Sequence, residues 1–158
     1  AWITRGLKSG ALREIKTEAA NGQLRDRVVF TQDWPSLQEP LATSNRLRIL
    51  SPFDPALRNR ARAEEIFGFS YCIEVFVPAA QRQYGYYVFP ILEGSALISH
   101  IEIKAKRKKN VIEIIGFWPE ADVKFTPARM EKLMAELKRI CLLADCRDIT
   151  GLEVLRSI

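Results

Sequence analysis

The sequence has few of the residues on which catalytic and metal sites depend. Its 158 residues include one histidine, His100, and three cysteines, Cys72, Cys141 and Cys146, with no Cys-x-x-Cys spacing. This set predicts neither a zinc site nor a disulfide framework. No Ser-His-Asp arrangement or phosphate-binding loop is present, and no partner that would orient His100 can be identified. We therefore assign no catalytic residue, metal or cofactor, and we interpret His100 as structural or solvent-exposed.

Long apolar runs are also missing. No stretch approaches the roughly eighteen apolar residues that a membrane-spanning helix needs, and no secretory signal opens the chain. We expect no membrane partner, and the unpaired cysteines favour a reducing cytoplasm. The contents of 47% hydrophobic and 27% charged residues are those of a globular protein with a proper core.

Positive charge is in modest excess, with a formal net charge of +5. The excess favours an anionic partner, nucleic acid first, although a surface with a few extra lysines explains it equally well. One expected hairpin turn concentrates this charge in five cations within six positions: Lys104, Lys106, Arg107, Lys108 and Lys109. A cationic hairpin of this kind can lie across phosphates or enter a minor groove, so we predict DNA contact here rather than a solubilising turn.

The first forty residues predict a helix followed by a hairpin. Trp2, Ile3 and Leu7 have helical spacing, and two strands flank a type I′ turn at Asn21-Gly22. A winged-helix domain ends in this way, and a wing carrying Arg25 and Arg27 would touch a DNA backbone. Any α+β domain can contain the same pair of elements. The chain starts inside the expected helix, so we expect it to be the tail of a longer protein.

A domain boundary is predicted at residues 42–45, which are small, polar and without periodicity. Residues 34–41, between Pro35 and Pro40, are expected to be short-helical or irregular. We assign residues 1–41 to the C-terminal part of a winged-helix domain and residues 46–158 to a second module.

The second module alternates strand and helix signals. We expect a helix over 55–67, which carries Arg58 and Arg60 as further candidate DNA-binding residues, and a second helix beginning at Thr126-Pro127. Strands are expected at 46–50, 71–77, 84–92, 97–104, 111–118 and 149–158. Pro90 suggests that its strand either lies at an edge of the sheet or ends close to this residue. The fold class is α+β, with a small antiparallel β-barrel or strongly curled sheet and a C-terminal helix.

The stretch from Gln81 to Tyr87 interleaves Arg82 with three tyrosines. Such a mixture suits stacking on bases, with Arg82 beside the backbone. The tyrosines equally suit packing on a sheet with their hydroxyls at its rim, and we favour packing.

Four motifs follow one another between Leu50 and Leu92: LSPFDP, R-x-R-A-E-x-I-F-x-F-x-Y, E-x-F-x-P-A and R-Q-Y-G-Y-Y-V-x-P-I-L. Together they resemble the YcaQ/AlkZ family of winged-helix DNA glycosylases. These proteins are associated with repair of interstrand crosslinks and bulky alkylated bases. The resemblance implies tandem winged helices followed by a small β-barrel, and hydrolysis of the N-glycosidic bond of alkylated purines. It attributes catalysis to a Gln-x-Gln or Gln-x-Asp motif with an apolar middle residue, in a part of the protein N-terminal to this chain.

The chain departs from the family pattern at several places. Gln81-Arg82-Gln83 has an arginine in the middle, so it is not the catalytic motif. Arg58-Asn59-Arg60 replaces Trp-Asp-Arg, and Ser99-His100-Ile101-Glu102 replaces Gly-Arg-x-Asp. A basic residue is usual where this chain has Cys72.

The resemblance implies a C-terminal, DNA-binding portion of a repair glycosylase. Its partners would be duplex DNA and the N-terminal winged-helix domains of the same protein, in the cytoplasm on the nucleoid. The alternative is a non-catalytic remnant that serves as a scaffold or protein-interaction module.

Overall fold

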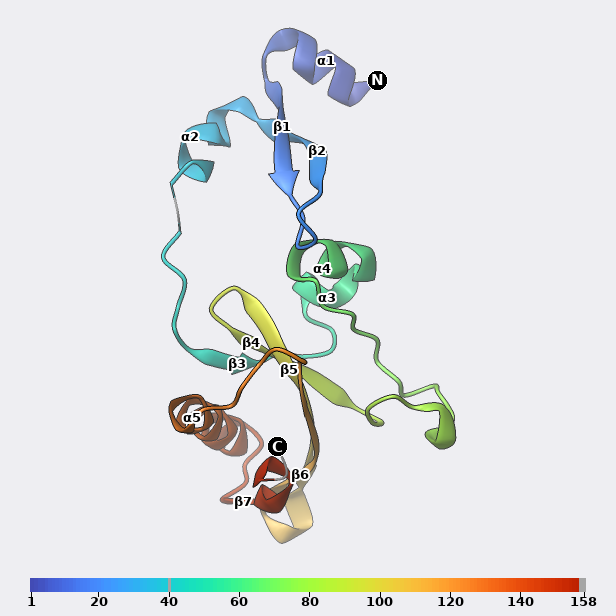
Figure 1. Ribbon diagram of the computed structural model, residues 1–158, viewed down its shortest axis with the longest axis vertical. Helices are drawn as coiled ribbons and strands as arrows, with labels where there is room; N and C mark the ends of the chain where they lie inside the picture. Colours follow the sequence, from blue (N-terminus) through green and yellow to red (C-terminus); the bar gives the residue numbers. More distant parts are fainter. Residues whose placement is uncertain (40, 157–158) are drawn as a thin grey trace.

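The computed structural model describes residues 1–39 and 41–156. Figure 1 shows an N-terminal helix and hairpin above a curled sheet with its helices. The helices are α1 (Trp2–Ser9), α2 (Trp34–Leu37), α3 (Pro55–Arg58), α4 (Arg60–Phe67) and α5 (Pro127–Leu143), with short 3-10 helices η1 (Thr31–Asp33), η2 (Ala79–Gln81), η3 (Arg107–Lys109) and η4 (Leu152–Arg156). The strands are β1 (Leu12–Glu18), β2 (Leu24–Phe30), β3 (Leu47–Ile49), β4 (Val88–Glu93), β5 (Ala96–Lys106), β6 (Val111–Pro119) and β7 (Asp148–Thr150).

The expected N-terminal helix and hairpin are confirmed. β1 and β2 pair antiparallel along their whole length, and Trp2 of α1 packs edge-on against Phe30. The type I′ turn is wrong. Gly22 has a φ of 78°, but Asn21 is not in the left-handed region, and the Gly22 N–H donates to the Ala19 carbonyl at 2.8 Å. The loop is therefore a longer one in which only the glycine needs positive φ.

The connection from hairpin to sheet begins with η1 and α2. The guanidinium of Arg13 lies 4.5 Å from the ring centroid of Trp34, which ties α2 to the hairpin. Residues 41–46 have no regular structure and are exposed, while Pro40 lies outside the described residues. The winged-helix assignment and the domain boundary at 42–45 stay predictions.

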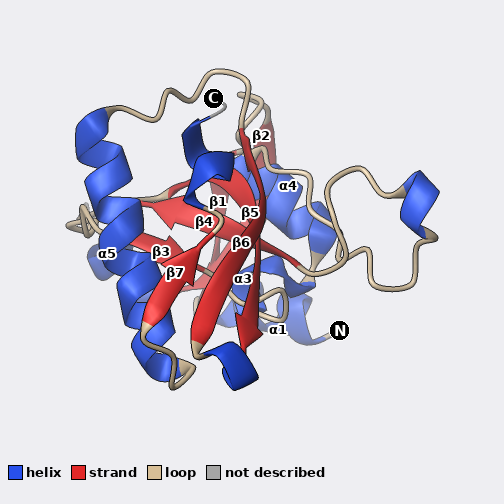
Figure 2. Ribbon diagram, turned by 90° about the horizontal axis from the view of Figure 1, so that it is seen from below, coloured by secondary structure: helices blue, strands red, loops and turns tan. Residues whose placement is uncertain are grey.

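The second module is built on one five-stranded sheet in the order β3-β4-β5-β6-β7. The first four strands are antiparallel, and β7 is parallel to β6. Register shifts at Ile91/Leu92 and Glu102/Ile103 bend β4 and β5. The sheet curls but stays open between β3 and β7, so it forms a half-barrel (Figure 2). The α+β class, with a curled sheet and a C-terminal helix, is confirmed.

Helix α5 supplies one wall of the main core. It begins as expected, with the Thr126 side chain accepting the Arg129 N–H at 3.3 Å and Pro127 in the first turn. Leu133 and Leu137 are completely buried against the sheet. Leu142, by contrast, is 78% exposed near the C-terminal end of the helix.

The expected helix over 55–67 is divided into α3 and α4 at Asn59. Asn59 has extended angles (φ −99°, ψ 101°), and its side chain accepts the Arg62 N–H at 3.1 Å, which caps α4. Gly68 ends α4 in the left-handed region, as expected. Ala63 is buried in a second, smaller core beneath the two helices.

Residues 71–87 form a projecting arm in place of the expected strand at 71–77 and the first part of the strand at 84–92. The outer part of the arm, around η2, stands away from the sheet in both views (Figures 1 and 2), and Phe76 is 95% exposed, whereas Tyr84 packs back on β5. Apolar alternation predicted a strand here, but no strand of the described sheet pairs with 71–77.

Two carboxylates accept backbone N–H groups of the arm that a neighbouring strand would otherwise bind. Glu74 and Glu102 each accept two consecutive backbone N–H groups: Gln83 (2.8 Å) and Tyr84 (2.9 Å) for the first, Tyr86 and Tyr87 (both 3.1 Å) for the second. Although partial burial opposes it, these N–H groups hold the pKa of Glu74 below its ordinary range. A side chain at Gly85 would meet the Glu102 carboxylate, so the close approach requires glycine there.

Two further strand expectations are corrected. β4 lies between β3 and β5 rather than at an edge. Pro90 is tolerated because its carbonyl accepts the Leu50 N–H, so its nitrogen faces the side where β3 has already ended. The terminal strand expected at 149–158 is limited to β7 and is followed by η4. Residues 157–158 lie outside the described residues.

Candidate nucleic-acid interface

The turn between β5 and β6, called the tip below, gathers the five predicted cations. Its 3-10 helix η3 ends at Asn110, which adopts a left-handed φ of 60°. Among the described tip residues, only Lys106 pairs with a carboxylate, that of Glu113 at 2.9 Å. This hydrogen bond, with help from Lys109 and Lys104, lowers the pKa of Glu113. The remaining cations face solvent and repel one another, so an approaching anion would be stabilised.

The backbone of another cationic residue, Arg147, contacts the end of the tip, while its side chain lines a hollow beside α5. The exposed Arg147 immediately precedes β7, and its N–H donates to the Asn110 carbonyl at 2.9 Å. Asp148 follows it, opposite Val111 in the parallel pair of β6 and β7. Sequence reasoning missed Arg147, because its position depends on how β7 pairs with β6.

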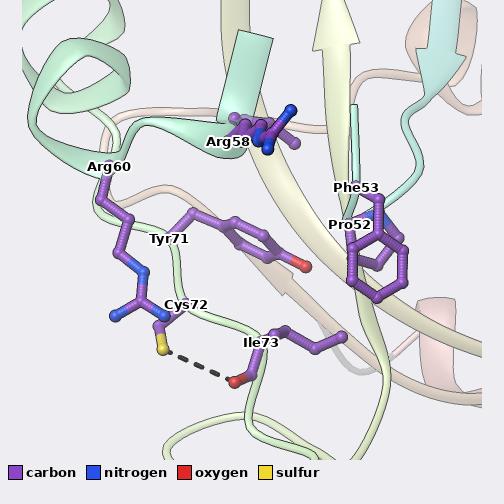
Figure 3. A pocket seen from close by; sticks show the side chains of 8 residues that line it. Pro52, Phe53, Arg58, Arg60, Tyr71, Cys72 and Ile73 are labelled. Atoms are coloured by element: carbon purple, nitrogen blue, oxygen red, sulfur yellow. Dashed lines mark hydrogen bonds between the residues drawn. The ribbon is translucent and has the colours of Figure 1, made fainter. Parts of the chain in front are cut away.

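Arg58 and Arg60 lie far from the tip. They face one cavity of about 430 Å³ on the side of α3 and α4, together with Phe53 and Tyr71 (Figure 3). Burial raises the pKa of Tyr71, whose hydroxyl donates to the Val88 carbonyl at 2.7 Å. The cavity thus combines two cations with aromatic walls.

The two hairpin arginines have different surroundings. Arg25 is exposed and donates to the side chain of Gln23 at 2.7 Å. Arg27 pairs with Glu65 of α4, and the Ala20 N–H donates to the Glu65 carbonyl at 2.8 Å. The end of the hairpin therefore docks on α4, which leaves Arg25 more available to an outside anion than Arg27.

Arg82 joins two parts of the arm through a hydrogen bond and a ring contact. Its Nε donates to the Val77 carbonyl at 2.9 Å, and its guanidinium lies 5.0 Å from the ring centroid of Tyr86. Tyr84 and Tyr87 pack on other rings of the module, which agrees with the packing interpretation. The ring of Tyr86 remains half exposed beneath the arginine.

His100 is 1% exposed, so the solvent-exposed alternative is wrong. Its ring lies between those of Phe69 (4.4 Å) and Tyr84 (4.2 Å), because the arm covers this face of β5. Burial lowers its pKa to about 4. The Ser70 backbone and the charge of Glu74 oppose this shift only in part, and Nδ1 is 3.3 Å from a carboxylate oxygen of Glu120. A neutral, enclosed imidazole is a structural group.

The cations form two separate patches. Leu97, near the start of β5, packs with the core beneath α3 and α4, whereas Lys106 ends the strand at the tip. At the usual rise per residue, nine residues along a strand span at most about 30 Å. Figure 1 shows the tip at the bottom of the view, with α3 and α4 above the sheet.

The family model for AlkZ-like DNA glycosylases matches residues 1–142, which include β1 to β6 and the five predicted tip cations but not β7 or Arg147. The chain belongs to the AlkZ-like DNA glycosylase family. The match confirms the resemblance found in the sequence, and membership implies DNA as the partner. A search of solved structures found no match to this chain.

Within the described residues, this AlkZ-like chain contains no group of three or more His, Cys, Asp or Glu side chains placed to hold a metal ion. None of the described helices has the length and apolar character that crossing a bilayer requires. Gln81 and Gln83 lie at the exposed outer part of the arm, around Arg82.

Proposed function

We propose that this chain is the C-terminal, DNA-binding portion of a DNA-repair glycosylase that acts on alkylated or crosslinked purines. In this proposal, hydrolysis of the N-glycosidic bond belongs to the full-length protein, through a Gln-x-Gln or Gln-x-Asp motif outside this chain. The N-terminal winged-helix domains of that protein are partners of this portion, and the protein acts on the nucleoid in the cytoplasm.

The tip is the observation that carries the proposal. Five cations gather there, and one carboxylate, that of Glu113, pairs with one of them. Family membership supplies DNA as the anion. A narrow hairpin with lysines on exposed positions suits the backbone and the minor groove of a duplex, with little preference for sequence.

Fluorescence anisotropy with a labelled duplex over a range of salt concentrations tests the proposal. The double variant Lys108→Ala/Lys109→Ala should bind more weakly than the wild-type chain. Its plot of log affinity against log salt should be shallower by about 0.9 for each phosphate that the variant no longer neutralises. The double variant Lys8→Ala/Lys124→Ala is the matched control, because it removes the same charge from exposed positions away from the tip.

Equal slopes for the two variants would overturn the assignment of the tip. The non-catalytic scaffold is the second candidate, and exposed Leu142 and Leu143 on α5 are apolar groups that a protein partner would cover. It predicts no DNA binding at low salt, together with a stable homo-oligomer in sedimentation.

A further inference from the structure

The cavity beside α3 and α4 has the composition of a nucleotide site. It holds about 430 Å³, within the range of roughly 300–1,000 Å³ found for small-molecule sites. Arginine and aromatic side chains lie on its walls, and no acidic side chain is among the lining residues. Figure 3 shows Arg58 at the top of the cavity and Arg60 on the left, running down towards Cys72, with the Tyr71 ring between them and Phe53 with Pro52 on the opposite side from Arg60.

The break at Asn59 brings the two arginines to one cavity. In a continuous helix, residues two apart are rotated by about 200° around the helix axis, so their side chains lie on nearly opposite faces. The extended conformation of Asn59 lets Arg58, which ends α3, and Arg60, which begins α4, line the same space. Neither side chain has an ion pair or hydrogen bond within residues 1–39 and 41–156, whereas Arg62 donates to the Pro55 carbonyl at 2.6 Å. Two uncompensated guanidinium groups suit a phosphate.

Phe53 offers a ring to this cavity from a constrained turn. Its side chain is 71% exposed, although Pro52 beside it is buried. Its N–H donates to the Ser51 side chain at 3.2 Å, and Asp54 accepts the Ala56 N–H to cap α3. Because prolines restrict the backbone on both sides, the ring is presented at little further cost in conformational entropy.

We propose that this cavity binds an unpaired nucleotide of a DNA strand, with the base stacked on Phe53 and the flanking phosphates paired with Arg58 and Arg60. Stacking on an aromatic ring accepts any base, while the guanidinium groups select the phosphate. The proposal rests on the proposed DNA-binding function. It adds a second site that binds an unpaired nucleotide, whereas the tip binds the duplex backbone. A free nucleotide shares this chemistry, so the test separates the two sources.

Cys72 makes the cavity directly observable, because it lines the cavity and is exposed while Cys141 and Cys146 are buried. The rate of its alkylation by N-ethylmaleimide is measured by mass spectrometry. Three probes are compared: a paired duplex, the same duplex with a one-nucleotide bulge, and a nucleoside monophosphate. Slower alkylation with the bulged duplex than with the paired duplex supports the proposal. Slowing by the monophosphate alone overturns it in favour of a free-nucleotide site.

Phe53→Ala should reduce the affinity for bulged DNA about fivefold or more, the lower range for loss of one stacked base, and leave the affinity for paired duplex unchanged. Phe76→Ala removes a still more exposed phenylalanine (95% against 71%) from the arm and is the matched control. If the chain binds paired duplex but Phe53→Ala leaves its affinity for bulged DNA unchanged, the nucleotide site is overturned and the proposed function stands. If neither DNA binds, the proposed function fails as well.

Discussion

The ring of Tyr84 stacks on that of His100, with centroids 4.2 Å apart and planes inclined by 16°. One residue belongs to the arm and the other to the central strand β5. The stack buries the face of β5 on which His100 lies, a face that the alternating polar and apolar residues of this strand would leave exposed to solvent. It also makes the packing of the arm depend on the protonation state of one imidazole.

The first prediction concerns acid stability. Burial lowers the pKa of folded His100 from its ordinary 6.5 to about 4, so the unfolded chain binds this proton more readily. Stability from this group is complete above pH 6.5 and falls as the pH decreases towards 4, by up to about 3 kcal/mol. Urea unfolding at a series of pH values measures the loss.

His100→Phe isolates this contribution, because phenylalanine keeps the ring and has no nitrogen to protonate. The difference in unfolding free energy between wild type and variant should change between pH 6.5 and 4. Nearby Glu120 acts in the opposite direction, since burial raises its pKa, and the difference therefore reports His100 together with its 3.3 Å contact to Glu120. Parallel curves for the two proteins would show that His100 does not titrate as described.

The second prediction concerns the arm. Glu102→Ala leaves the N–H groups of Tyr86 and Tyr87 without their acceptor, at a cost of about 1–3 kcal/mol. Hydrogen exchange at these two amides should accelerate. Glu131→Ala, on the exposed side of α5, is the control and should leave their exchange unchanged. Equal protection in both variants would mean that another group holds the arm.

The third prediction concerns Glu136, which is 3% exposed and joins α5 to the edge strand β3. Its carboxylate accepts the Ile49 N–H at 3.1 Å and pairs with Arg139 and Arg48. Although burial opposes it, these partners lower its pKa. Glu136→Gln should therefore destabilise the fold by about 1–3 kcal/mol at pH 7. The difference from wild type should shrink as the pH falls below 4.5, where the unfolded chain takes up the proton, and disappear once the folded carboxyl, with its lower pKa, is protonated as well. A difference independent of pH would exclude the ion pairs as its source.

The fourth prediction separates the tip from the fold. Lys108 and Lys109 are exposed and have no carboxylate partner among the described residues, so their repulsion opposes folding slightly. Lys108→Ala/Lys109→Ala should bind DNA more weakly without unfolding at lower urea. Lower stability would indicate that these lysines pack rather than bind.

Elements whose backbone hydrogen bonds are local were predictable from the sequence. The cap and proline at Thr126-Pro127 start α5, and the cation-rich turn before Asn110 forms the tip. The inner end of the arm was not predictable, because Glu102, fifteen or more residues away in sequence, accepts the N–H groups of Tyr86 and Tyr87 in place of a neighbouring strand. Arg147 was missed for the same reason, since only the pairing of β7 with β6 places it beside Asn110.

The most direct measurement of the central claim, that the tip contacts DNA, is lysine acetylation with and without a duplex, read by mass spectrometry. The account predicts that DNA protects Lys104, Lys108 and Lys109, while Lys8 and Lys124 react at unchanged rates. Protection spread evenly over all five lysines, or confined to Lys8 and Lys124, would contradict it.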